Sequence, residues 1–113
     1  MIKIKAACGC LLQAGFTLKD RKLGEGEMLE FRTVLAGENG SVSIVRTMTE
    51  DGKGDSKNAH TTLSVDLSEY SVLPGLYGWE LLLKRADGKY FCLLPADGNI
   101  LQISRTLFAE DAV

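Results

Sequence analysis

Three cysteines and one histidine are the side chains of this 113-residue chain best suited to binding a soft metal ion. Cys8 and Cys10 flank a single glycine, and Zn²⁺ normally takes four ligands, so Cys92 and His60 would have to complete such a site. The residue alternation around the pair instead puts both cysteines on a buried strand face, as small hydrophobic side chains. We therefore expect no metal and no cofactor. A disulfide would need oxidising conditions and would leave one cysteine over.

Catalytic chemistry has few candidate groups. His60 ends the polar, glycine-rich stretch EDGKGDSKNAH (residues 50–60), which we interpret as a mobile loop with a solvated imidazole. The stretch lacks the D-x-D-x-D-G frame and the closing glutamate of a calcium loop. The sequence also contains no nucleophile elbow, phosphate-binding loop or dinucleotide fingerprint. We expect a protein that is not an enzyme.

The composition is that of one globular domain, which we assign to residues 1–113. Hydrophobic residues make up 45% and charged residues 25%, with a net charge of -2, so the chain offers no basic surface for nucleic acid. It has no apolar run of about 18 residues that would span a membrane. The start, MIKIKAAC, lacks the apolar segment of a signal peptide, and we expect the chain to be made in, and not exported from, a reducing cytoplasm.

These residues must be positioned by β-strands, because hydrophobic side chains alternate with a period of two through most of the chain. Residues 2–18 read as two strands, or one strand bent at Gly9 or Gly15. Further strands are predicted at residues 28–35, 42–49, 61–67, 76–86, 89–94 and 99–107. A short helical turn is expected within SEYSVLPG (residues 68–75). About seven short strands predict an all-β sandwich or barrel.

Two Asp-Gly pairs predict the register of the last three strands. Each pair suits a two-residue type I′ turn, and Pro74-Gly75 suits a type II turn. If both Asp-Gly loops have two residues, three rows cross one face: Leu81–Leu94–Leu101, Leu83–Cys92–Ile103 and Arg85–Tyr90–Arg105. Because the first two rows are wholly apolar, this face is predicted to be the core.

The same register sorts the remaining side chains of these strands. Tyr77 and Trp79 fall on the core face, where paired aromatic residues pack more often than they bind a ligand. The opposite face gathers Leu82, Phe91 and Leu93, more large apolar groups than a solvated face usually carries. Either another segment covers this cluster, or it is a surface for protein–protein contact.

The C-terminal half also resembles a known family. SVDLSEYSVLPGLYGWELLLKRADGKYFCLLPADGNILQISRTL contains an L-P-G run with a tyrosine that leads into a strand, a DG turn, a strand ending at a glycine turn, and a last strand. In this order of elements it is similar to the N-terminal immunoglobulin-like domain of phage baseplate upper proteins, and to small stand-alone prophage proteins built like it. The resemblance covers residues 63–107.

The resemblance implies an immunoglobulin-like antiparallel β-sandwich of about seven or eight strands. It implies a non-catalytic structural or assembly module of a phage or prophage tail or baseplate, made in the bacterial cytoplasm and then built into the virion. Its partners would be another protein or further copies of itself, with no nucleic acid, membrane or small-molecule substrate. The alternative is a carbohydrate- or cell-surface-binding module, which would need Tyr70, Tyr77 or Trp79 exposed as a stacking platform.

Overall fold

The computed structural model describes residues 2–105 as an all-β structure of eight strands. They are β1 (Lys3–Ala7), β2 (Leu11–Leu18), β3 (Met28–Gly37), β4 (Gly40–Met48), β5 (Ala59–Asp66), β6 (Gly75–Lys84), β7 (Tyr90–Leu94) and β8 (Ile100–Ser104). The all-β prediction and the expected number of strands are confirmed. The predicted end of the last strand at Leu107 lies outside the described residues.

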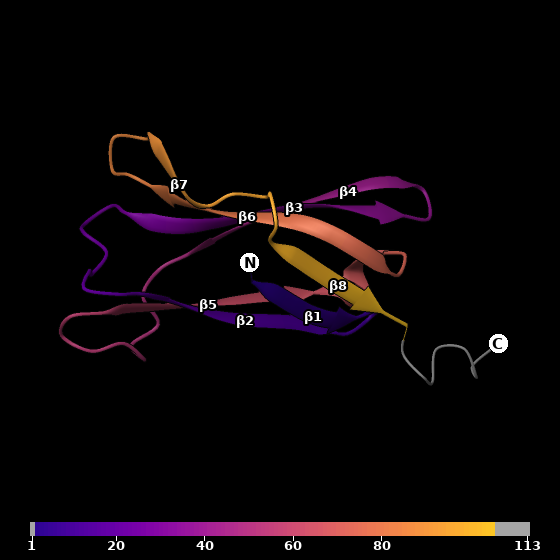
Figure 1. Ribbon diagram of the computed structural model, residues 1–113, viewed down its shortest axis with the longest axis horizontal. Coiled ribbons are helices and arrows are strands. Elements are labelled where there is room, and N and C mark those ends of the chain that lie inside the picture. The colour runs from indigo at the N-terminus through magenta and orange to yellow at the C-terminus, as the bar shows by residue number, and fades with distance from the viewer. Residues whose placement is uncertain (1, 106–113) are drawn as a thin grey trace.

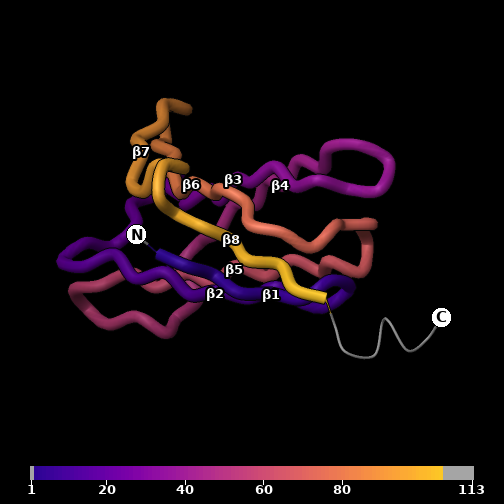
Figure 2. Tube along the Cα trace, turned by 45° about the vertical axis from the view of Figure 1, so that its right-hand side comes forward, coloured from indigo at the N-terminus to yellow at the C-terminus, as the bar shows by residue number. Residues whose placement is uncertain are grey.

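The strands form two sheets, which face each other in Figure 1. The larger sheet has the order β1-β8-β6-β3-β4, with β7 as a further strand on β6, and the smaller sheet pairs β2 with β5. β1 runs parallel to β8, with Lys3 opposite Ile100, and the two lie side by side in Figure 2. The larger sheet is therefore mixed, and the predicted wholly antiparallel arrangement is wrong. No hairpin joins these two strands, so chain connectivity does not force them to be antiparallel.

Alternate residues of both sheets point inward and form the apolar core. Its members include Leu12, Phe16, Leu63 and Val65 from the smaller sheet and Leu29, Phe31, Leu35, Trp79, Leu81 and Leu83 from the larger. Trp79 is 1% exposed, and its ring centroid lies 5.8 Å from that of Phe16 and 5.7 Å from that of Phe31. The prediction that Trp79 packs into the core is confirmed. Tyr77 is partly buried against the same cluster.

A tight turn separates β1 from β2 and leaves the first two cysteines less buried than the alternation predicts. Gly9 has a φ of 71°, and the Cys10 N–H donates to the Ala7 carbonyl (3.1 Å). Because the turn interrupts the alternation, Cys10 is exposed and Cys8 is only partly buried. The prediction that both cysteines are buried is therefore wrong, whereas the division of this segment into two strands is confirmed.

The turn between β6 and β7 is not the predicted type I′ turn, which needs a positive φ at both central residues. Gly88 has a φ of 84°, but Asp87 is not among the residues with positive φ. The Arg85 N–H donates to the Lys89 carbonyl (2.8 Å), and the Gly88 N–H donates to the Arg85 carbonyl (2.9 Å). The loop between the paired residues therefore has three residues rather than two.

This extra residue shifts the hairpin register by one, which turns β7 side chains to the other face of the sheet. Leu83 pairs with Phe91, where the two-residue turn predicted Cys92. A β-bulge next to Leu81 then compensates for the shift. The predicted pair of Leu81 with Leu94 is consequently confirmed.

β8 does not pair with β7, so the predicted rows that joined these strands are wrong. It pairs instead with the first half of β6, where Leu101 lies opposite Tyr77, and with β1. The rejected pairs are Leu94–Leu101, Cys92–Ile103 and Tyr90–Arg105. At the second Asp-Gly pair only the glycine, Gly98, has a positive φ (82°), so this type I′ turn does not form either.

The segment before β6 departs from the predicted type II turn at Pro74-Gly75. Gly75 is not among the glycines with positive φ and pairs with Ile103 as the first residue of β6. The short helical turn expected in this region is confirmed as the 3-10 turn η1 (Leu67–Glu69). The Asp66 carboxylate caps it by accepting a hydrogen bond from the Ser68 N–H (3.0 Å).

Candidate interaction surface

Leu82 lies on the outer face of the larger sheet, opposite Glu30 on β3 and Cys92 on β7. It is only 7% exposed, although it is not part of the apolar core between the sheets. The Arg32 guanidinium lies 4.8 Å from the ring centroid of Tyr90. Because β3 and β7 flank β6, this contact passes over the outer face of β6, and it explains why Leu82 is covered.

The cover is a small polar network built from β3 and β7. Arg32 donates through Nε to a Glu30 carboxylate oxygen (2.5 Å), and the Tyr90 hydroxyl lies 3.4 Å from the other oxygen. The hydrogen bond from Arg32 to this buried carboxylate is the main reason that the pKa of Arg32 is raised. Leu82 therefore lies beneath a structural network and not on an open surface.

Phe91 and Leu93 are both exposed, in contrast to Leu82. Phe91 lies opposite Leu83 but on β7, at the edge of the sheet and outside the core, where it is 54% exposed with the Arg85 guanidinium 5.4 Å from its ring centroid. Leu93 is the extra residue at the bulge of β7 and is 37% exposed. The prediction that Leu82 shares a face with Phe91 is wrong, for the reason given by the one-residue shift of the hairpin.

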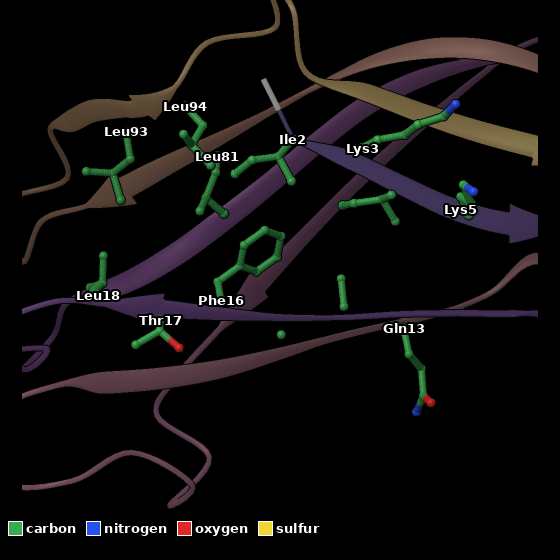
Figure 3. A pocket seen from close by; sticks show the side chains of 13 residues that line it. Ile2, Lys3, Lys5, Gln13, Phe16, Thr17, Leu18, Leu81, Leu93 and Leu94 are labelled. Atoms are coloured by element: carbon green, nitrogen blue, oxygen red, sulfur yellow. The ribbon is translucent and has the colours of Figure 1, made fainter.

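An open groove begins beside Leu93 and runs between β1 and β2. It encloses about 620 Å³ and is lined by Ile2, Lys3, Ile4, Lys5, Gln13, Ala14, Gly15, Phe16, Thr17, Leu18, Leu81, Leu93 and Leu94. Figure 3 shows Leu93, Leu94 and Leu81 on one side of this hollow and Phe16 and Leu18 on the other. Asn99 fixes the mouth by accepting a hydrogen bond from the Ile2 N–H (2.9 Å). The sequence pattern did not point to Ile2, because the groove depends on pairings between distant strands.

The three aromatic side chains that a carbohydrate-binding module would need to expose are buried or hydrogen-bonded within the protein. Trp79 is buried in the core, and the Tyr77 hydroxyl donates to the Leu73 carbonyl (2.5 Å). The Tyr70 hydroxyl accepts a hydrogen bond from Arg46 (2.9 Å), and its ring packs against the core. None of these three rings is presented as an open stacking platform.

His60 occupies a different setting from the predicted solvated loop. It lies in β5, and its Nδ1 is 2.6 Å from an oxygen of Asp51, which also accepts a hydrogen bond from the Thr62 hydroxyl. The loop interpretation of residue 60 is therefore wrong, since the strand begins at Ala59. The Thr62 hydroxyl donates to the Asp51 carboxylate, and the other ring nitrogen of His60, Nε2, faces Gly15, which has no side chain. This cluster therefore brings no nucleophile to Nε2.

The cysteines do not gather into a ligand set. The Cys8 thiol lies 3.4 Å from the Val72 carbonyl, and burial raises the pKa of this thiol. Cys10 and Cys92 are both exposed. Across residues 2–105, no group of three or more His, Cys, Asp or Glu side chains is arranged to hold a metal ion.

The chain matches no protein-family model, no curated protein and no solved structure in the comparisons made. Within residues 2–105, no helix has the length and apolar character needed to cross a membrane.

Proposed function

We propose that this chain is a non-catalytic immunoglobulin-like β-sandwich module of a phage or prophage tail or baseplate, which assembles through the exposed side chains of β7. The observation that carries the proposal is the exposure of Phe91 and Leu93 on one short strand at the edge of its sheet. Single exposed apolar side chains are common on protein surfaces. Two of them lie on the same short strand here, and one of them, Leu93, also lines the groove, so this end of the larger sheet offers more exposed apolar surface than a single side chain would.

The resemblance of residues 63–107 to the phage baseplate family supplies the biological setting of this proposal. In that setting the chain is made in the bacterial cytoplasm and then incorporated into the virion. Its partner is either a further copy of the chain or another structural protein. The two facing sheets with a tryptophan at their centre are compatible with an immunoglobulin-like sandwich.

Multi-angle light scattering after size exclusion tests the surface. The wild-type chain should form a dimer or larger assembly, or bind a structural protein encoded next to it, and Phe91→Asp should abolish this association. Leu76→Asp is the matched control, because Leu76 is an exposed leucine on the outer face of β6 and does not line the groove. Association that is unchanged by Phe91→Asp would overturn the assignment of β7 as the contact surface.

A further inference from the structure

β1 and β2 present two strand edges to each other without forming a sheet. In the part of the chain that the structure describes, β1 pairs with β8 and β2 pairs with β5. The turn at Gly9 joins the two strands at one end, from which they enter different sheets. A strand edge without a partner carries main-chain N–H and C=O groups that can pair with an added strand. The groove lies between these two edges (Figure 3).

The groove follows the chain, as a site for an extended peptide would. Its lining includes the continuous residues 2–5 of the β1 segment and 13–18 of β2. Six strand residues extend over about 20 Å, which is the length of an ordinary β-strand. A site for a small molecule would instead be expected to gather scattered side chains around a compact pocket.

The side chains of the groove have a period of two and a single sign of charge. Ile4 and Phe16 are buried and form the apolar floor, whereas Lys3 and Lys5 lie on the exposed side of β1. None of the 13 lining residues is an aspartate or a glutamate. A strand placed here would turn alternate residues toward the floor and the others outward to the rim, where Lys3 and Lys5 are the charged side chains among the 13 lining residues. The floor selects apolar residues, and the lysines select acidic ones.

We propose that this groove binds an extended segment of a partner protein, in which apolar residues alternate with aspartate or glutamate, by adding a strand to the free edge of β2. This inference rests on the proposed function only in requiring a protein partner. Main-chain hydrogen bonds to β2 provide the affinity that is independent of sequence, and the apolar floor and the two lysines provide the selection. The added strand fills the space between the two sheets.

Two labelled octapeptides test the proposal by fluorescence anisotropy at low salt. One alternates valine with glutamate, and the other alternates valine with lysine. The glutamate peptide should bind at least about tenfold more tightly, because two exposed lysines attract one peptide and repel the other. Amide NMR shifts should follow β1 and β2. Binding of neither peptide, equal binding of both, or shifts confined to other strands would overturn the proposal.

Charge-reversal variants make this test specific to the groove. Lys3→Glu/Lys5→Glu should reverse the preference between the two peptides, whereas the control Lys57→Glu/Lys89→Glu changes the net charge equally and should leave the preference unchanged. An unaltered preference in the first variant would overturn the role of the lysines. A third peptide with the sequence of residues 105–113 is the competing occupant. If it binds in the groove while the glutamate peptide does not, the occupant is a second copy and the partner assignment is overturned.

Failure of this inference can be told apart from failure of the proposed function. Phe91 does not line the groove, so Phe91→Asp should leave peptide binding unchanged even if it abolishes assembly. Ile2→Asp should weaken peptide binding at least about tenfold, because it places a carboxylate at the apolar mouth of the groove. Peptide binding that survives Ile2→Asp would place the bound peptide elsewhere.

Discussion

Removal of the Arg32 side chain should destabilise the fold by about 2 kcal/mol. Glu30 is 5% exposed, and Arg32 is the cation that lies against its carboxylate. Breaking a fully buried ion pair costs about 3–5 kcal/mol, and losing an exposed one costs about 0.2–1 kcal/mol. The Arg32 side chain is 37% exposed, so water can partly replace it, and an intermediate value follows. For a chain of this length, about 2 kcal/mol corresponds to a decrease in Tm of about 8 °C.

The assay is a double-mutant cycle in urea, with Trp79 fluorescence as the signal. Arg32→Ala, Glu30→Gln and the double variant should show a coupling of at least about 1 kcal/mol, because the neutral amide no longer needs the cation. Arg21→Ala is the matched control. Its guanidinium pairs with Glu27 at 2.7 Å, but the Glu27 side chain is 15% exposed where that of Glu30 is 6%, so the loss should be smaller than that of Arg32→Ala.

Two results would refute this reasoning. Additive effects of Arg32→Ala and Glu30→Gln within about 0.5 kcal/mol would show that the pair is not coupled. Equal losses in Arg32→Ala and Arg21→Ala would show that burial of the carboxylate does not matter. Arg32→Ala should also leave the assembly that depends on Phe91 intact, because the network covers Leu82 and not β7's exposed side chains.

Three further predictions concern the smaller sheet and the core. Gly15→Ala should cost about 1–3 kcal/mol in urea unfolding, since the added Cβ would lie 2.8 Å from His60 Nε2, and adding His60→Ala should recover part of the loss. Although desolvation raises the pKa of Asp51, hydrogen bonds from Thr62, a main-chain amide and His60 outweigh it and lower that pKa. The lowered pKa stabilises the folded state fully above the usual carboxyl pKa of 3.8, and this stabilisation is lost as the pH falls below that value. The difference in stability between wild type and Asp51→Asn should therefore shrink below pH 3.8, and unfolding midpoints measured against pH check this. Acrylamide should quench Trp79 several-fold less in the folded chain than in urea, because the ring is buried; equal quenching would contradict its place in the core.

The existence of the strands could be predicted from the sequence because alternation is a local property. Residues 28–35 were predicted as a strand, and β3 runs from Met28 to Gly37 with buried and less buried residues in near-regular alternation. The inward direction of Trp79 followed from the same pattern. For Phe91 and Leu93 the alternation leaves open whether another segment covers them; the structure shows both exposed, and Phe91 on a different face from Leu82.

The register could not be predicted from the turn residues alone. An Asp-Gly pair suits a type I′ turn, but it equally suits a longer loop in which only the glycine has a positive φ. Gly88 takes the second form, and one additional loop residue is enough to reverse the face of Phe91. The free-energy difference between such loops depends on the packing of residues distant in the sequence, such as Arg32 against the Tyr90 ring, which a local pattern does not contain.

The partners of β8 depend on contacts that are still further apart in the sequence, and they also create the groove. One edge of β6 is shared, because Gly75–Gly78 pairs with β8 and Leu81–Lys84 pairs with β7. If β8 had continued the hairpin beside β7, its first half would not be held between β6 and β1. Because β8 instead pairs with β6 and β1, β1 becomes the end strand of the larger sheet and faces β2, while β7 stays short and exposed. The groove is therefore a consequence of dividing the edge of β6 between two strands, and it brings Leu93 and Leu94 of β7 next to the free edge of β2.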